Sequence, residues 1–256
     1  MKEILSRTRA AVDKYAMIPD GSHIAVGVSG GKDSLAVLYA LAGLRRFYPN
    51  EFRITAVTAD PCFGGAETDF SAVTEFCETL GVQHIIRRTR LYEIVFEEQK
   101  EKNPCALCAR MRRGILHNMA VENGCTHVAL GHHADDAAET VLMNLLCGGR
   151  FGGLQPKSFL DRKQLTVIRP LIFCDEKLIE RAARKYAFPV VKSGCPADGN
   201  TERRRVRELM EQLEGSYPDL RAKLTGAAER LEERLGSSES VKPPEGGIRT
   251  PNKQAD

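Results

Sequence analysis

The stretch HIAVGVSGGKDSLAVLYALAGL, residues 23–44, decides the fold. Residues 23–28 form a short apolar run with β-branched side chains, which is typical of a buried strand. A helical pattern begins at about Ser34 and continues to Arg46. Because a glycine-rich turn joins the two, this order of strand, turn and helix predicts an α/β unit with an anion site at the turn.

The turn reads Ser29-Gly30-Gly31-Lys32-Asp33-Ser34. Two consecutive glycines let backbone N–H groups approach an anion, and the following helix adds free N–H groups and its positive dipole end. The serine hydroxyls are further donors, and Lys32 adds a positive charge. A plain strand–helix turn is the alternative, but it does not explain the full string. The turn is not a Walker A loop, since Asp33 stands where that motif has Ser or Thr and Val26 where it has its first glycine.

Beyond this unit, apolar runs alternate with helical patterns along the chain. The expected strands are residues 23–28, 53–59, 83–88, 126–131 and 165–170, and the run 188–191 is also strand-like. The expected helices are residues 3–16, 34–46, 68–80, 110–123, 135–146, 176–186, 201–214 and 218–235, with Asp175 as an N-cap. This alternation predicts an α/β fold with a doubly wound, mainly parallel sheet and helices on both faces.

Length and composition fit one large domain. The chain has 256 residues, of which 42% are hydrophobic and 28% charged. We expect a single α/β domain over residues 1–236, with an N-terminal helix and C-terminal helices, and a disordered tail over residues 237–256. The longest apolar run, Ser34–Leu44, is too short to span a bilayer, and the N-terminus lacks the pattern of a secretory signal. We therefore expect a cytoplasmic protein without a membrane partner.

A second group of polar residues follows the strand expected at 126–131. It reads Gly131-His132-His133-Ala134-Asp135-Asp136. Since ligands bind beyond the carboxyl ends of parallel strands, the loops 29–34, 60–66 and 131–136 should share one edge of the sheet. Two carboxylates at a helix N-terminus facing the glycine turn suit Mg²⁺ binding or substrate positioning. The alternative is a capping aspartate with a neighbour that stabilises the helix dipole.

Eight cysteines occur in the chain, and disulfides are not expected in a mid-sized protein without an export signal. Cys77 and Cys147 lie in apolar runs and are predicted to be core side chains. Cys105 and Cys108 form a CxxC, which fits a redox pair, half a zinc site or part of an iron–sulfur cluster. No second CxxC exists, which disfavours a four-cysteine zinc ribbon. Cys195 is either an incidental loop cysteine or a third ligand, and three thiolates can hold an iron–sulfur cluster with one iron open for sulfide.

The net charge is only +3, but arginines are clustered. The clusters are Arg87, Arg88 and Arg90; Arg110, Arg112 and Arg113; and Arg203, Arg204, Arg205 and Arg207. Such clusters can neutralise RNA phosphates and give salt-sensitive binding. The alternative for each cluster is a solvated basic helix face.

The glycine turn resembles the PP-loop motif of the N-type ATP pyrophosphatases, which adenylate a carbonyl oxygen and release pyrophosphate. Three further stretches resemble the tRNA 2-thiocytidine synthetase branch of that superfamily: NPCALCARMRRGILHNMA, LGHHADDAAETVLMNLLCGGRFGG and VIRPLIFCDEKLIERAARKYAFPV. The resemblance covers about residues 5–235. It implies the PP-loop fold, which is like that of the adenine nucleotide alpha-hydrolases.

The resemblance also implies site residues. A 4Fe–4S cluster would be held by Cys105, Cys108 and Cys195, beside an ATP site. The implied ATP contacts are Ser29, Gly30, Gly31, Lys32, Asp33 and Ser34, with Asp60, Gly131, His132, Asp135 and Asp136 nearby. This chain departs from the family at the third cysteine, which usually lies in a longer string with its own CxxC. Here that string is shortened to KSGCPADGNTERRR, so the surface that faces RNA is altered.

The implied activity is that of an ATP-dependent tRNA sulfurtransferase, which adenylates a base carbonyl and replaces its oxygen with sulfur. The expected target is C2 of a cytidine in the anticodon loop. The expected catalytic residues are Lys32, Asp33, Asp135 and Arg112, with Mg²⁺ and Lys32 stabilising phosphate charge. Arg112, one helical turn past Cys108, would orient the base or a phosphate, or is simply solvated.

The expected partners are tRNA and a cysteine desulfurase or another sulfur donor, and the sequence also allows a homodimer. One alternative function is a ligase of the lysidine synthetase type, which shares the turn but leaves the three cysteines unused. The other is a non-catalytic iron–sulfur or nucleotide-sensing module.

Overall fold

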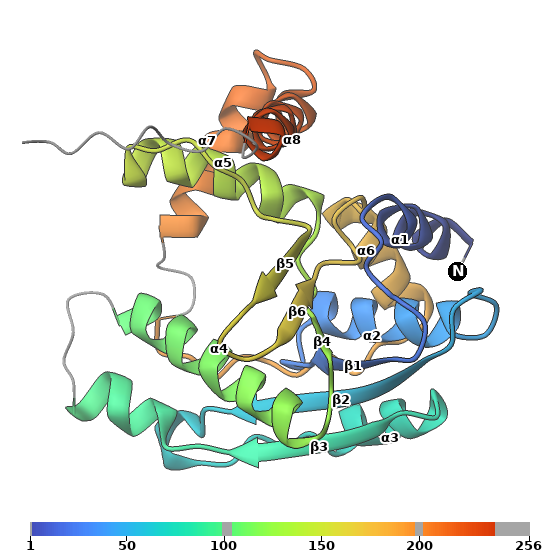
Figure 1. The fold of residues 1–256 in the computed structure, drawn as a ribbon. Helices are drawn as coiled ribbons and strands as arrows, with labels where there is room; N and C mark the ends of the chain where they lie inside the picture. The colour runs from blue at the N-terminus through green and yellow to red at the C-terminus, as the bar shows by residue number, and fades with distance from the viewer. Residues whose placement is uncertain (1, 99–103, 198–201, 239–256) are drawn as a thin grey trace, which may run out of the picture.

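A six-stranded sheet forms the centre of the molecule in the computed structural model, which describes residues 2–98, 104–197 and 202–238 (Figure 1). The strand order is β3-β2-β1-β4-β6-β5. The strands are β1 Ser22–Gly27, β2 Phe52–Asp60, β3 Gln83–Arg88, β4 His127–Ala129, β5 Lys157–Leu160 and β6 Leu165–Ile168. All neighbouring pairs are parallel except β5 and β6. The expected mainly parallel α/β sheet is therefore confirmed.

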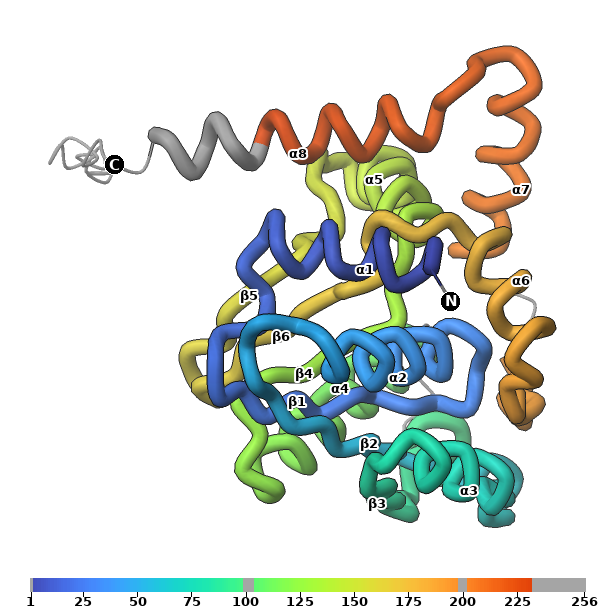
Figure 2. The backbone as a smooth tube through the Cα atoms, turned by 90° about the vertical axis from the view of Figure 1, so that its right-hand side faces the viewer, coloured from blue at the N-terminus to red at the C-terminus, as the bar shows by residue number. Residues whose placement is uncertain are grey.

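Helices cover both faces of this sheet. They are α1 Lys2–Lys14, α2 Lys32–Leu44, α3 Ser71–Thr79, α4 Pro104–Glu122, α5 Ala134–Gly148, α6 Glu176–Lys185, α7 Glu202–Glu214 and α8 Leu220–Ser238. The larger core lies under α1, α2, α3 and α6, and a second core lies under α4 on the opposite face. Figure 2 shows α8 lying across α5, with α7 leading into it. None of the described helices is long and apolar enough to cross a membrane.

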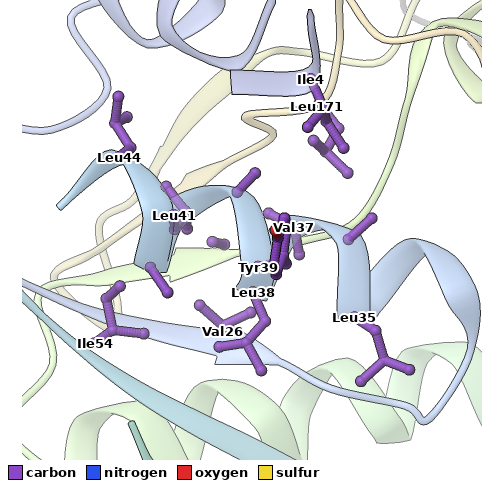
Figure 3. Packing of buried hydrophobic residues seen from close by; sticks show 14 of the residues in the cluster. Ile4, Val26, Leu35, Val37, Leu38, Tyr39, Leu41, Leu44, Ile54 and Leu171 are labelled. Atoms are coloured by element: carbon purple, nitrogen blue, oxygen red, sulfur yellow. The ribbon is translucent and has the colours of Figure 1, made fainter. Parts of the chain in front are cut away.

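The core positions follow from the strand pattern. Successive side chains of a strand point to opposite faces, so Ile24 and Val26 of β1 lie in the α2 core and Ala25 lies in the α4 core. Leu38 and Leu41 of α2 pack over β1 and β2 (Figure 3). α2 is apolar around most of its circumference because α1, α6 and the sheet all contact it.

The strand order determines where a ligand can bind. From β1 the chain adds β2 and β3 on one side, and β4 and β6 are added on the other side. The crossover helix α2 lies on one face and α4 on the other. The strand order reverses between β1 and β4, so the loops that leave these two strands lie next to each other at the carboxyl edge, and ligands bind at such a topological switch point.

Several expected elements differ from the structure. The helix expected to begin at Arg110 begins at Pro104, so Cys105 and Cys108 lie in its first turns. A proline is well tolerated at a helix start, because it has no N–H that would be left unpaired there. The helix expected from Thr68 begins at Ser71. The short antiparallel β5 was not expected, and neither were the 3₁₀ turn Phe63–Gly65 (η1) and the π-helical turn Glu93–Glu98 (η2).

The segment 188–191 and the end of α8 also differ from expectation. The strand-like run 188–191 is not a strand, because the backbone N–H of Val191 donates to Gly30 O, in the loop after β1, instead of to a sheet neighbour. α8 continues through Ser238, two residues into the stretch expected to be disordered. The remaining residues of that stretch, 239–256, lie outside the described residues.

Candidate active site at the carboxyl edge of the sheet

The glycine turn, residues 29–34, connects β1 to α2 and closes on itself. Ser34 Oγ donates to Gly31 O at 2.8 Å and accepts from Ser29 N at 3.1 Å. Gly30 has a φ of +83°, and a Cβ there would lie 2.9 Å from the side chain of Val191. Glycine is therefore required at position 30 both by its backbone conformation and by close packing. No side chain caps α2, so N–H groups of its first turn remain available to an anion.

The acidic loop, residues 131–136, connects β4 to α5 and touches the glycine turn backbone to backbone. A Cβ at Gly131 would lie 2.6 Å from Asp33 O and 2.9 Å from Ser34 N. His133 is the N-cap of α5, and Asp136 accepts the backbone N–H of His133 at 3.1 Å. The two loops that were predicted to share one edge of the sheet are thus in direct contact.

A cleft of about 470 Å³ opens between these loops and α4. Seven of the predicted site residues line it: Ser29, Asp33, Ser34, Arg112, Gly131, His132 and Asp136. Apolar side chains of β2 and α4, among them Val57 and Leu116, form another part of its wall. A polar turn facing an apolar wall suits a nucleotide, whose phosphates and base need these two environments.

His133 is a site residue that the sequence reasoning did not single out. It is 1% exposed, and its ring nitrogens lie 3.4 Å from Asp135, 3.4 Å from Asp136 and 3.8 Å from Asp33. Burial lowers the pKa of His133, but the three carboxylates outweigh burial and the net pKa is raised. His133 therefore holds the acidic groups of both loops together. Its only sequence signal was its place within the acidic string.

The two aspartates of the acidic loop have different surroundings. Asp135 accepts the N–H of Glu176 at 2.7 Å and pairs with Arg221 at 2.8 Å. Burial raises the pKa of Asp135, but these partners and His133 lower it to about 2, so the carboxylate is ionised. Asp136 caps α5 and still lines the cleft. Capping is thus observed for Asp136, and Mg²⁺ binding stays a prediction for both.

Lys32 and Asp60 do not line the cleft. Lys32 Nζ lies 2.9 Å from Asp33 and 2.8 Å from Glu176. Asp60 is fully buried and accepts from Thr68 N at 2.8 Å and from Arg88 at 3.0 Å, so it fixes the loop after β2. ATP contacts by these two residues remain predictions, and Lys32 would have to leave Glu176 to make one.

The three candidate cluster ligands gather near α4. Cys105 and Cys108 lie in its first turns, and Cys195 lies in the segment 188–197, which crosses the glycine turn. Burial raises the pKa of the Cys108 thiol, Arg112 lowers it, and charges on Cys195 and Cys105 raise it. The three thiols are therefore within electrostatic reach of one another.

These thiols match a three-cysteine 4Fe–4S cluster in donor type and number. Within the described residues, no group of three or more Cys, His, Asp or Glu side chains is placed to hold a single metal ion. A 4Fe–4S cluster sets a different requirement, because each thiolate binds its own iron and the sulfurs of Cys105, Cys108 and Cys195 need not converge on one point. The segment that carries Cys195 has few anchors: Gly194 packs on Phe63, and Val191 N donates to Gly30 O at 3.0 Å.

The other cysteines are not part of this group. Cys77 is fully buried in the larger core, as predicted. The prediction that Cys147 is a core residue is wrong, because it is exposed at the end of α5, where the helix extends beyond the core.

The arginine clusters separate in space. Arg87 and Arg88 end β3 and Arg90 follows it, and they are held in ion pairs with Glu122, Asp60 and Glu93, so they do not form a solvated helix face. In α7, Arg203 lines the cleft and pairs with Asp136 at 2.9 Å, and Arg207 pairs with buried Glu139 at 2.7 Å. Arg204 and Arg205 pair with exposed glutamates of their own helix.

A glycine turn after β1, facing an acidic loop after β4, defines a nucleotide-binding α/β protein. Comparisons with known proteins narrow this class. The PP-loop domain family model matches residues 3–213. The tRNA-cytidine(32) 2-sulfurtransferase of Geobacter sulfurreducens is 37% identical, with 91% of each chain covered. The relative of the same name from Dichelobacter nodosus is 40% identical over 81% of this chain and 78% of its own.

A solved structure agrees with these relatives. The U34-tRNA thiolase NcsA from Methanococcus maripaludis, determined with its 4Fe–4S cluster, is 27% identical, with a TM-score of 0.75. The match covers 91% of this chain and 78% of that one. The chain therefore belongs to the PP-loop family, in the group of the tRNA-cytidine(32) 2-sulfurtransferases. The resemblance seen in the sequence is confirmed.

Proposed function

We propose that this chain is an ATP-dependent tRNA sulfurtransferase. It adenylates the carbonyl oxygen on C2 of a cytidine and then replaces that oxygen with sulfur. The observation that carries the proposal is the position of Arg112. It lines the cleft together with Ser29 and Ser34. Burial raises the pKa of the Cys108 thiol, one helical turn before Arg112, and the positive charge of Arg112 lowers it. Arg112 thus connects the nucleotide turn, which we call the phosphate end of the cleft, to the thiols beside its α4 wall, which we call the cysteine end. A lysidine-type ligase would leave this connection without a use.

The glycine turn and α2 would bind the outgoing pyrophosphate portion of ATP through their N–H groups. Asp33 and Asp136, held together by His133, would hold Mg²⁺ on the phosphates. Lys32 would exchange Glu176 for a phosphate oxygen. These groups would stabilise the charge that develops when the base oxygen attacks the α-phosphorus and pyrophosphate leaves.

The second half of the reaction takes place at the cysteine end. Adenylation turns the base oxygen into part of AMP, which is a good leaving group when sulfur attacks C2. Cys105, Cys108 and Cys195 would hold a 4Fe–4S cluster, which supplies a site for the incoming sulfide. Arg112 would orient the base between the two ends. The sulfide would come from a cysteine desulfurase or another donor.

The test follows both products in one assay. Anaerobically purified protein is incubated with ATP, sulfide and tRNA from a strain that lacks this gene. We expect AMP and pyrophosphate together with 2-thiocytidine in the digested tRNA. Formation of ADP would exclude attack at the α-phosphorus. An unchanged thionucleoside profile in the deletion strain would exclude tRNA thiolation altogether.

A further inference from the structure

Arg113 and Arg169, beside the cleft, have no carboxylate partner among the described residues, and neither has Arg112, which also lines the cleft. Arg113 is an exposed residue of α4 that lines the cleft. Arg169 follows β6 directly and is half-buried. Its guanidinium donates through Nη1 to Gln155 O, whereas its Nε is buried and has no hydrogen-bond partner.

Leu130 N donates to Ile168 O at 3.0 Å, so Arg169, the next residue, lies beside the part of the cleft wall that Leu130 and Gly131 form. Burial lowers the pKa of Arg169 to about 10, and the positive charge of Arg113 lowers it as well. His132 lies in the same corner, and burial together with Arg169 lowers its pKa to about 4. Its Nδ1 is also buried without a partner. The corner therefore contains two cations, a neutral imidazole and two unpaired polar atoms.

This arrangement is unlike the rest of the site. Arg203, Arg207 and Arg221 each reach a carboxylate within 2.9 Å. Leaving a half-buried cation without a counter-charge is unfavourable, because the interior solvates charge poorly. An anion bound at this corner would remove that cost and would also satisfy Arg169 Nε.

We propose that Arg113 and Arg169 form a second phosphate subsite, which binds a backbone phosphate of the RNA substrate next to the reacting base. This inference rests on the proposed tRNA activity. Under the proposed function, the phosphates of ATP bind the glycine turn and a Mg²⁺ held by Asp33 and Asp136. A further phosphate in the same cleft must come with the second substrate, and a nucleotide within an RNA chain carries one on each side. Paired arginines are well suited to phosphate oxygens.

The test compares tRNA binding by the wild type, Arg113→Gln, Arg169→Gln and the double variant, at several salt concentrations. Arg162→Gln, in the exposed turn between β5 and β6, is the matched control. We expect each single variant to lose about tenfold in tRNA affinity, the equivalent of about 1.4 kcal/mol, because a charge-assisted hydrogen bond to the phosphate is removed. The plot of log affinity against log salt concentration has a negative slope, and its magnitude should decrease by about 0.7 for one lost phosphate contact. Because both residues bind one phosphate, the double variant should lose no more slope than a single variant.

The affinity for ATP, measured by calorimetry, should be unchanged in all four variants. Loss of ATP affinity with normal tRNA affinity would assign the subsite to a nucleotide phosphate and overturn the proposal. Unchanged tRNA affinity in Arg113→Gln and Arg169→Gln, with tight wild-type binding, would overturn it while leaving the proposed function intact. If the wild type fails to bind tRNA, the proposed function itself fails. Arg113 is exposed, so its variant carries the test even if Arg169→Gln does not fold.

Discussion

The two ends of the cleft are built in opposite ways. At the phosphate end, the glycine turn and the acidic loop emerge from adjacent parallel strands and touch through their backbones. At the cysteine end, a helix start and an irregular segment face each other with few anchors between them. The first end is fixed by sheet register, so it tolerates almost no displacement. The second has no sheet register to fix it, and the proposed function requires it to accept both an iron–sulfur cluster and an RNA base.

The largest effect should come from the cysteine end, in Cys108→Ser. We expect complete loss of iron and of thiolation, because serine is a poor ligand for an iron–sulfur cluster. The tRNA-dependent release of pyrophosphate should persist, since the phosphate end is untouched. Iron analysis and a pyrophosphate assay on the same preparation check this. Cys147→Ser, at an exposed cysteine, is the control and should keep both iron and activity. Full iron retention in Cys108→Ser would contradict the ligand assignment.

Gly131→Ala tests the rigidity of the phosphate end. The added Cβ would lie 2.6 Å from Asp33 O, so one loop must shift and the turn must open. We expect ATP-dependent pyrophosphate release to fall by about a hundredfold or more, because small misplacements of binding groups have such effects.

Gly194→Ala is the matched change at the cysteine end. Its Cβ would lie 3.3 Å from Phe63 Cβ, a contact that a shift of a few tenths of an ångström relieves, so pyrophosphate release should stay near the wild-type rate. Equal losses in the two glycine variants would remove the contrast between the two ends.

Ser34→Ala should have an intermediate effect. Removing Oγ breaks two hydrogen bonds inside the turn, to Ser29 N and Gly31 O, and each contributes about 0.5–1.5 kcal/mol. The expected loss of ATP affinity is about tenfold to about a hundredfold. Titration calorimetry measures it, and Ser6→Ala on the exposed face of α1 is the control. Normal ATP affinity in Ser34→Ala would show that the turn does not depend on this hydroxyl.

The smallest effect is expected for Glu176→Gln, and it has the opposite sign. Glu176 holds Lys32 at 2.8 Å in a half-buried ion pair that ATP must displace. Loss of that competitor should tighten ATP binding by about fivefold, the equivalent of about 1 kcal/mol. Weaker binding in this variant would mean that Glu176 instead positions Lys32 for the phosphate.

The phosphate end could be predicted from the sequence because its signals are local. Residues 29–34 and 131–136 are contiguous strings after strands, and the geometry of a parallel sheet brings such strings together. The short β5 could not be predicted, because only two of its four residues are even partly buried. The prediction that Cys147 is buried was wrong, because an apolar helical pattern does not show at which residue the helix extends beyond the core.

The ion pairs of the site lay beyond sequence reasoning. Lys32 and Glu176 are 144 residues apart, and Asp135 and Arg221 are 86 apart. No sequence pattern indicates which charged residues at such separations will form an ion pair. The packing of α6 and α8 brings Glu176 and Arg221 to their partners. The role of His133 was hidden for the same reason, since its contact with Asp33 joins two loops that are distant in the chain.

The burial of Glu139 has a consequence for how the molecule opens. This carboxylate of α5 is 1% exposed and lies 2.7 Å from Arg207 and 3.8 Å from Arg203. Detaching α7 would strand an uncompensated charge in the interior, which typically costs about 3–5 kcal/mol. Amide protons of α7 should therefore exchange with deuterium together with those of α5, as one cooperative unit, although α7 lies late in the chain and contributes no strand to the sheet.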